Sequence, residues 1–425
     1  MDTMSYSEQV LEKFEAGNIE EGNRLYGWAL RKDDDDTLNS LAEELYGLGF
    51  DGKAKRIYEN LLKKYPQEDT LRVNLADIEI GQGNTDAALQ QLAQVKPDSD
   101  AYLQSLLVSA DLYQTEELYE VSEQKLLEAE KLAPDEQIVL FALAEFYNMV
   151  QNYKKATAYY LTLVKQGVLR LSSVNLVARL AAAYAGMGKF ETSMAYFEQI
   201  KDIDKTPDIL FQQGFVYLQL KNYPEAIDML TQLRDTNQDY VSLYPVLAEA
   251  QENNGDNEAA YKTIQEGISF DEYNEDLFSQ AARLATQLQK YDDAEHYLKE
   301  AIKINPEQMR AVVQLSNLFI QQQRYQDNDD LLQPYIQEND LDPQIYWNIA
   351  VSEEHLENFK EAQNAYQNAF PFFTNNSDFL HAAIYFFRQI GLEDWTVKSL
   401  RAYLKLVPDD QELSLMLEDY EENGF

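Results

Sequence analysis

The alternation of apolar and polar positions is clearest between Leu210 and Leu233. At the period of an α-helix, this stretch gives two amphipathic helices joined by a short polar turn at residues 221–222. Pro224 stands where the second helix should begin, a position at which the missing N–H has no partner to lose. The apolar faces carry Gly214, Tyr217 and Leu218 on the first helix, and Ala226, Leu230 and Leu233 on the second. The stretch therefore predicts a helical hairpin.

One small residue of the second helix recurs along the whole chain, at a spacing of about 34 residues. A longer side chain there would overpack the crossing of the two helices, at a cost of ~1–3 kcal/mol. The pattern predicts about twelve hairpins. The recurring residues are Gly22, Ala54, Ala88, Ser122, Ala156, Ser193, Ala226, Ala260, Ala294, Asn328, Ala362 and Thr396.

Two further features recur in phase with the small residue. A small pair lies in the first helix of most hairpins, as at Leu75-Ala76 and Leu247-Ala248. An aromatic residue opens many of the second helices, at Tyr119, Tyr153, Phe190, Tyr223, Tyr291, Tyr325 and Phe359. Together these positions resemble the tetratricopeptide repeat, and the resemblance implies an all-α, right-handed superhelical α-solenoid.

The spacing also suggests how the repeats are divided. We expect one continuous solenoid, with amino-terminal repeats in residues 1–166, carboxyl-terminal repeats in 167–408 and a capping helix in 409–425. The longest gap between small residues predicts an extended connection at 165–173, which is a candidate hinge. Asn328 in the small position, followed by Pro334, predicts a distorted tenth hairpin, because proline inside a helix removes a hydrogen bond.

Composition restricts the function further. The chain has 425 residues, a formal net charge of -39 and no cysteine. Such acidity disfavours nucleic acid and anionic lipid as partners and favours basic protein surfaces. A simpler interpretation is that the charge only keeps the chain soluble. The acidic start and the lack of a long apolar run predict no signal peptide and no membrane insertion, and with the absent cysteines they favour the cytoplasm.

No pattern of a catalytic or cofactor site is present, so we expect a non-enzymatic protein without cofactor or metal. His355 and His381 with Glu354 are a weak candidate for a metal or base site, and polar surface is the simpler interpretation. The acidic run 33–36 is a weak calcium candidate for which a solvated loop and helix start is the simpler interpretation.

In tetratricopeptide repeat proteins the first helix of each hairpin lines a concave groove, so the resemblance implies which residues could bind a partner. The amino-terminal half is expected to carry an acidic row suited to a basic segment, formed by Glu43, Asp77, Asp111 and Glu145. The carboxyl-terminal half is expected to carry the peptide anchor, formed by Arg179, Phe211, Phe215, Arg283, Arg310, Asn317, Trp347, Asn348, Tyr385 and Arg388.

For each of these sets a plainer interpretation stays open. Phe215 and Trp347 could belong to the core, because aromatic residues at helical spacing usually pack, and the acidic row could reflect the general acidity of the chain.

The resemblance implies a scaffold or adaptor that binds cytosolic proteins or peptides. An alternative is a sensor of a small signalling peptide that changes the shape of the superhelix. In length, acidity and lack of added domains, the chain is similar to large cytosolic proteins of low-GC Gram-positive bacteria built only from such repeats. The sequence leaves the partner and the oligomeric state open.

Overall fold

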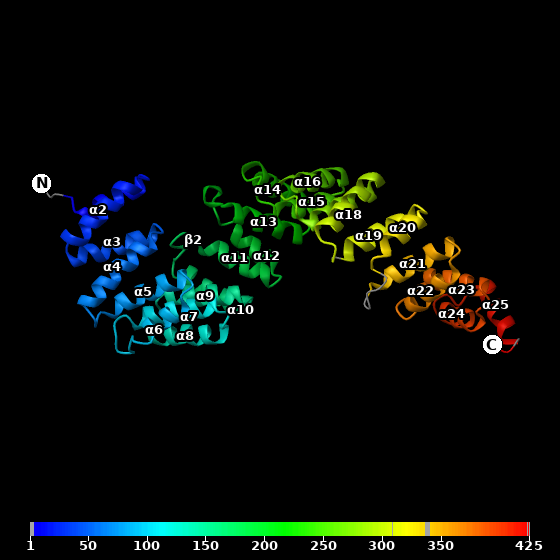
Figure 1. The fold of residues 1–425 in the computed structure, drawn as a ribbon, viewed down its shortest axis with the longest axis horizontal. Coiled ribbons are helices and arrows are strands. Elements are labelled where there is room, and N and C mark those ends of the chain that lie inside the picture. Colours follow the sequence, from blue (N-terminus) through cyan, green and yellow to red (C-terminus); the bar gives the residue numbers. More distant parts are fainter. Residues whose placement is uncertain (1–3, 308, 336–340, 423, 425) are drawn as a thin grey trace. The chain divides into compact units, whose positions relative to one another are not determined.

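The computed structural model describes residues 4–307, 309–335, 341–422 and 424. The chain divides into two compact units, the first ending at Lys205 and the second beginning at Thr206 (Figure 1). The described residues of both units are helical apart from turns, connections and one two-stranded hairpin.

Unit 1 contains α1 (Tyr6–Glu15), α2 (Ile19–Lys32), α3 (Asp35–Gly47), α4 (Asp51–Lys64), α5 (Asp69–Gly81), α6 (Thr85–Leu92), α7 (Tyr102–Thr115), α8 (Tyr119–Leu132), α9 (Gln137–Met149), α10 (Tyr153–Lys165), β1 (Arg170–Leu171), β2 (Val174–Asn175), α11 (Leu176–Gly186), α12 (Phe190–Phe197) and the 3-10 helix η1 (Asp202–Asp204).

Unit 2 contains α13 (Pro207–Gln219), α14 (Tyr223–Thr236), α15 (Leu243–Asn253), α16 (Asn257–Phe270), α17 (Glu275–Gln287), α18 (Tyr291–Ile304), α19 (Met309–Gln321), α20 (Tyr325–Leu332), α21 (Pro343–His355), α22 (Phe359–Ala369), α23 (Ser377–Gln389), α24 (Glu393–Leu406) and α25 (Gln411–Glu422).

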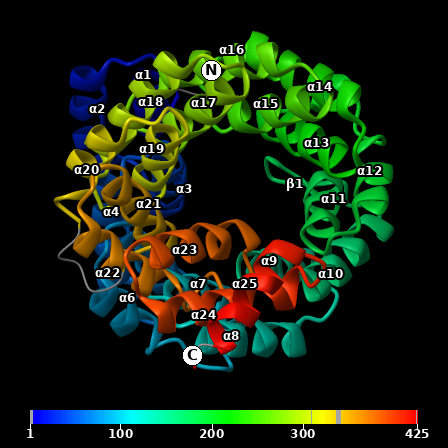
Figure 2. The same cartoon turned by 90° about the vertical axis from the view of Figure 1, so that its right-hand side faces the viewer.

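Consecutive helices pack in pairs, so the described residues form twelve hairpins, with α25 packed on α24 as a cap. This confirms the predicted all-α solenoid of repeats and its capping helix; residues 423 and 425 of the predicted cap lie outside the described residues. We call the odd-numbered helices α1 to α23 the A helices and the even-numbered helices α2 to α24 the B helices. Within each unit the A helices lie on the inner side of the curve and the B helices on the outer side (Figure 2).

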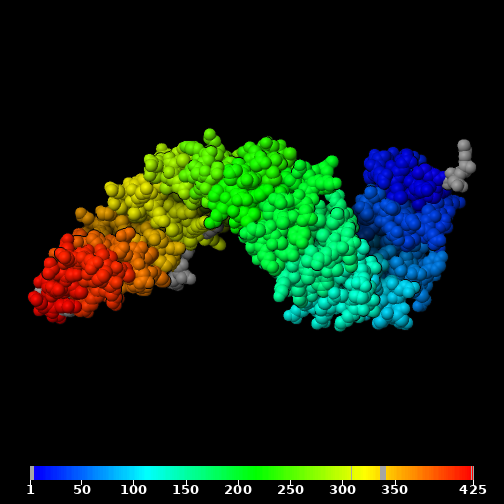
Figure 3. All heavy atoms as spheres, turned by 180° about the vertical axis from the view of Figure 1, so that it is seen from behind, coloured from blue at the N-terminus to red at the C-terminus, as the bar shows by residue number. Residues whose placement is uncertain are grey.

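The small position of each B helix is buried, as the sequence predicts. Ala54, Ala226 and Ala294 are completely inaccessible, and so is Asn328. At Gly22 an added Cβ would collide with the ring of Phe14. The two helices of a hairpin therefore cross closely; Figure 3 shows the outer surface of the chain with its atoms as spheres.

Each turn between an A helix and its B helix contains one residue in the left-handed region, where the chain reverses. In the central hairpin this is Lys221, with φ of 61°. The N–H groups of Lys221 and Asn222 donate to the carbonyls of Leu218 and Tyr217, which closes the end of α13. The residues in this role are Gly17, Gly49, Gly83, Glu117, Gln151, Gly188, Lys221, Gly255, Gln289, Gln323, Glu357 and Gly391.

The long connection after α10 contains a β-hairpin that the sequence did not indicate. Arg170 pairs with Asn175 and Leu171 with Val174 in antiparallel register, and Ser172 takes a positive φ of 52° between them. Helices α10 and α11 pack against each other beside this hairpin. The first compact unit extends past this connection to Lys205, and the division of the repeats at 166 with a hinge at 165–173 stays a prediction.

The tenth hairpin is shortened, and Pro334 does not lie inside a helix. Helix α20 ends at Leu332, two residues before the proline, so the helix stops before a kink can form. Asn328 is accommodated in the small position because its amide nitrogen donates to the Asn348 carbonyl at 3.3 Å and to the Ser352 hydroxyl at 2.8 Å.

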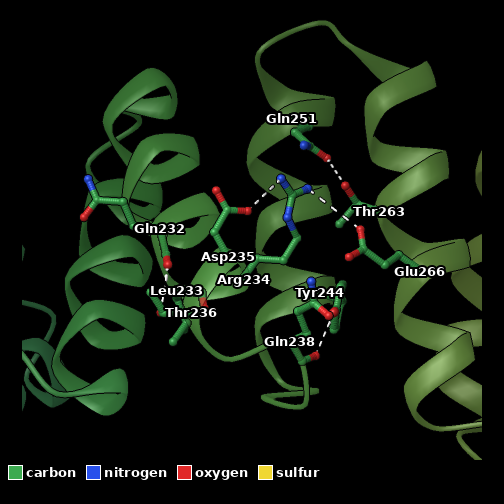
Figure 4. A network of polar contacts seen from close by, with 10 residues as sticks. All are labelled: Gln232, Leu233, Arg234, Asp235, Thr236, Gln238, Tyr244, Gln251, Thr263 and Glu266. Carbon is green, nitrogen blue, oxygen red and sulfur yellow. Dashed lines mark hydrogen bonds and ion pairs between the residues drawn. The ribbon is translucent and has the colours of Figure 1, made fainter.

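Polar contacts lie both within a hairpin and between neighbouring hairpins, as among α14, α15 and α16 (Figure 4). The Thr263 hydroxyl donates to Gln251 Oε1 at 2.7 Å, a contact buried between α16 and α15. The Arg234 guanidinium lies 3.8 Å from the Glu266 carboxylate and 3.4 Å from Asp235. The Arg234–Glu266 contact connects adjacent repeats, whereas the Thr263–Gln251 contact holds α15 and α16 of one repeat together.

Candidate functional site

A cavity of about 240 Å³ lies on the A-helix side of unit 2, between α17 and α19. It brings together Arg283 and Asn317, two residues that the sequence placed in the binding groove. Amide side chains supply most of its remaining polar groups, and the Gln314 Oε1 atom is buried without a hydrogen-bond partner. The cavity is lined by Ala282, Arg283, Thr286, Gln287, Leu298, Gln314, Asn317, Leu318 and Gln321.

Arg283 in this cavity is already paired. Its guanidinium donates to both carboxylate oxygens of Glu252, at 2.5 and 2.7 Å, and Gln287 donates to the same carboxylate at 3.1 Å. The pairing holds the pKa of Glu252 below its usual range and raises the pKa of Arg283. The guanidinium is thus oriented by Glu252 at the cavity, and its role in binding a peptide stays a prediction.

Asn348 is not accessible to a partner. It is 3% exposed, because α19 and α20 cover it. Its amide nitrogen donates to the Ser316 hydroxyl and to Asn317 Oδ1, and its Oδ1 accepts from Gln344 at 2.9 Å. Asn348 therefore links α19 to α21 instead of binding a peptide, and it positions the Asn317 side chain at the cavity.

Trp347 is half-buried and packs against the core of unit 2. Its ring makes edge contacts with Phe373 and Phe379, with centroid distances of 5.1 and 5.4 Å. Phe373 lies in the connection after α22, which folds back over the tryptophan. These contacts orient the ring, and the role of Trp347 as a groove anchor stays a prediction.

The two predicted phenylalanines on α13 differ from each other. Phe211 packs against the Tyr240 ring, with the centroids 5.3 Å apart. Phe215 is 37% exposed, more than any core residue of this unit. Phe215 is therefore the only one of the two that offers a large apolar surface to a partner.

The remaining predicted residues of unit 2 lie apart from the cavity. Tyr385 donates to Glu412 at 3.5 Å, and the Arg388 guanidinium lies 4.0 Å from the Met416 sulfur, so both contact the cap α25. Arg310 lies 3.8 Å from Asp276 with both side chains well exposed. Such an exposed pair contributes little energy and leaves Arg310 free to change partner.

In unit 1, Arg179 and Glu145 come together although the sequence assigned them to different halves of the groove. Their side chains lie 3.2 Å apart on α11 and α9. Glu145 also accepts a hydrogen bond from the Tyr160 hydroxyl at 2.5 Å. Both Arg179 and Glu145 are thus occupied within unit 1.

In the rest of the acidic row, Glu43 and Asp77 interact with uncharged side chains, Asn39 and Tyr46. Burial on the inner side of unit 1 raises the pKa of Asp77 and of Asp111, and the neighbouring charge of Asp111 raises that of Asp77 further. Glu43 is exposed and accepts only from the Asn39 amide, at 3.0 Å. Within the part of the chain that the structure describes, no lysine or arginine forms an ion pair with these three carboxylates.

Sequence reasoning missed the glutamines of the unit 2 cavity. Gln287 and Gln321 stand four residues after Arg283 and Asn317, at the same place in successive A helices. Residues four apart share a helix face, so Gln287 and Gln321 could have been predicted from the groove positions Arg283 and Asn317. Gln314 gives no comparable signal, since its accessibility depends on how α17 packs beside α19.

The histidines do not assemble a metal centre. His355 lies over Tyr325 with a centroid distance of 4.0 Å, and His381 lies 4.8 Å from the Tyr385 ring. The described residues contain no group of three or more histidines or acids close enough to hold a metal ion. In the same part of the chain, no helix has the length and apolarity that crossing a membrane requires.

Twelve stacked helical hairpins with this repeat length define a tetratricopeptide repeat protein. Profiles described as tetratricopeptide repeats match residues 52–108, 175–207, 208–239 and 279–343. Two further profiles, described as YpiA-like tetratricopeptide repeats and their C-terminal repeats, match residues 114–168 and 343–410.

A full-length relative identifies the particular family. The TPR repeat-containing protein YpiA of Bacillus subtilis (strain 168) is 31% identical over 415 residues, which covers 97% of this chain and 98% of the relative. The chain belongs to the family of YpiA-like tetratricopeptide repeat proteins.

Solved structures are similar at a lower level. A tetratricopeptide repeat protein from Parabacteroides merdae is 15% identical, with a TM-score of 0.46, and the match covers 62% of this chain and 98% of that chain. YrrB, described as a TPR protein with an unusual peptide-binding site, is 18% identical with a TM-score of 0.36, covering 44% of this chain and 95% of that one.

Proposed function

We propose that the chain is a non-catalytic adaptor that binds an extended segment of a partner protein along the A helices of unit 2. Tetratricopeptide repeat proteins are in general protein-interaction scaffolds, and the family supports this general role here. The observation that carries the specific proposal is the amide-lined cavity between α17 and α19.

The chemistry of the cavity favours a polypeptide backbone as its ligand. Glutamine and asparagine each present one acceptor and two donors, which match the N–H and C=O groups of an extended chain. The buried, unpartnered Oε1 of Gln314 would accept a hydrogen bond from such a backbone. Arg283 stays held by Glu252, so recognition there does not depend on a negative charge in the ligand.

The acidic row of unit 1 supports a second binding surface. Asp77 is half-buried, the charge of Asp111 raises its pKa further, and neither forms an ion pair among the described residues, so a lysine or arginine of the ligand would stabilise both carboxylates. We propose that this row binds a basic segment, either of the same partner or of another protein.

The first test is affinity purification with the wild-type protein and a variant that carries Gln314→Leu and Gln321→Leu. These changes keep the side-chain size and remove two amides of the cavity. The matched control carries Gln90→Leu and Gln232→Leu, which place the same change on exposed faces of the B helices α6 and α14.

The proposal expects the cavity variant to lose the partner that the wild type and the control retain. Retention of every partner by the cavity variant would contradict it. Recovery of only a short free peptide would favour the alternative, a sensor of a signalling peptide. Action in the cytoplasm stays a prediction from the sequence.

A further inference from the structure

A second and larger cavity, of about 550 Å³, lies on the other side of unit 2, against α24. One wall is a single face of α24, and the other is the connection between α22 and α23. Its position among the B helices separates it from the A-helix cavity described above. It is lined by Phe370, Thr374, Asn375, Asp394, Val397, Lys398, Arg401, Ala402, Lys405 and Leu406.

The charge of this cavity is opposite to that of the chain. Lys398, Arg401 and Lys405 recur along one face of α24, and all three are exposed. The chain as a whole has 74 acidic and 35 basic residues. Three cations facing one cavity, with Asp394 as the single acidic residue of its lining, therefore make a local positive site on an acidic molecule.

The Lys398 ammonium lies against two aromatic rings. The Lys398 ammonium lies 3.9 Å from the Trp395 ring centroid and 4.7 Å from that of Phe370. Leu406 is 40% exposed at the end of the same face. A ligand would thus meet positive charge and an apolar contact area together.

The structure already contains one example of the ligand chemistry. Glu421 of α25 lies with its carboxylate 2.9 Å from the Arg401 guanidinium. The pair is about half exposed, so the carboxylate can be exchanged for another at little cost. Among the described residues, no carboxylate forms an ion pair with Lys405.

We propose that this cavity binds an acidic segment of a partner protein in which carboxylates flank a bulky apolar side chain. Lys398 and Lys405 hold the carboxylates, Arg401 exchanges Glu421 for a third, and the apolar side chain lies against the exposed Leu406. A short peptide fits this site better than a polyanion, because a long nucleic acid or an anionic bilayer would also meet the net charge of -39.

The test uses the full-length protein and fluorescence anisotropy of a labelled peptide, Gly-Glu-Asp-Leu-Glu-Gly, with Gly-Gln-Asn-Leu-Gln-Gly as the neutral control. Three proteins are compared with the wild type. One carries Lys398→Gln and Lys405→Gln, one carries Glu421→Gln, and the matched control carries Lys154→Gln and Lys165→Gln on exposed positions of the B helix α10. Thermal melting followed by circular dichroism verifies that all four are folded.

The wild type and the α10 control are expected to bind the acidic peptide and to bind the neutral peptide much more weakly. The Lys398 and Lys405 changes should weaken binding about tenfold or more, and Glu421→Gln should strengthen it by freeing Arg401. Equal affinity of the wild type and the double variant would overturn the proposal, as would equal binding of the two peptides. Tighter binding of a single-stranded oligonucleotide or of anionic vesicles, or a dimer that the double variant dissolves, would also overturn it.

Discussion

At the scale of single residues, the small position of each B helix limits what the hairpin crossing can hold. Ala226 is completely buried, and Gly214 on the facing helix α13 has the Leu230 side chain directly against it. Neither position has space for added atoms. In α20 the small position holds Asn328, whose amide nitrogen donates hydrogen bonds to two acceptors on α21, the Asn348 carbonyl and the Ser352 hydroxyl.

Ala226→Leu is therefore expected to destabilise the protein by ~1–3 kcal/mol through overpacking. Glu225→Leu adds the same side chain one residue earlier on an exposed face and should change stability by less than about 0.5 kcal/mol. Urea unfolding of the two variants measures the difference. Equal midpoints would contradict the assigned packing.

The turn residues predict a change in the opposite direction. Lys221 holds a positive φ of 61°, a conformation that costs a residue with a side chain about 1 kcal/mol and costs glycine little. Lys221→Gly should therefore stabilise the protein by up to about 1 kcal/mol. Gln232→Gly, in the middle of α14, should destabilise it by about the same amount. Denaturant titration that showed both variants to be destabilised would refute the assignment.

The acidic row predicts a dependence on pH. Burial raises the native pKa of Asp77 above its value in the unfolded chain, so the charged form is penalised in the native state. The penalty is complete above the native pKa and disappears as pH falls through it towards about 4. Asp77→Asn should thus stabilise the protein by about 0.5–1 kcal/mol at pH 7.

That gain should shrink as the pH is lowered, and the variant should bind basic segments less well. Paired melting curves of wild type and variant between pH 4 and 8 measure it. A gain that stays constant with pH, or a loss of stability at pH 7, would show that Asp77 is not desolvated as described.

At the scale of elements, the strongest sequence signals located the hairpins well. Helices α8, α10, α12, α14, α18, α20 and α22 each begin at the aromatic residue that the sequence singled out. This succeeded because the repeat gives many independent copies of one local pattern. The β-hairpin at 170–175 has strands of two residues, too short to show a period, and could not be found in this way.

The candidate site was predicted only in part, because exposure depends on neighbours that the repeat does not specify. Arg283 and Asn317 do line a common cavity, since they occupy equivalent places in successive A helices. Trp347 occupies a groove position by the same rule, yet contacts with Phe373 and Phe379 leave it only half-exposed. Asn348 is buried by its contacts with Ser316 and Asn317.

At the scale of the whole molecule, the chain separates into two compact units with a short connection that contains η1. Ile203 in this connection is 93% exposed, the highest value among the exposed large apolar residues. The helices on both sides of the 165–173 connection, by contrast, pack within unit 1.

Brief trypsin digestion is therefore expected to cut first after Lys201 or Lys205 and to leave two fragments that divide near residue 205. Mass spectrometry of the early products identifies the cut. A variant with Lys201→Gln and Lys205→Gln should survive longer. First cleavage after Lys165 or Arg170 would instead support the hinge predicted from the sequence.

The most direct test of the central proposal is hydrogen–deuterium exchange of the protein with and without a purified partner. A partner segment bound in the A-helix cavity should slow exchange of backbone amides in α17 and α19 and of the turns that follow them, because bound chain excludes water there. The account predicts this protection in unit 2, and its loss when Gln314 and Gln321 are changed to Leu. Protection confined to the B helices, with α17 and α19 unchanged, would contradict it.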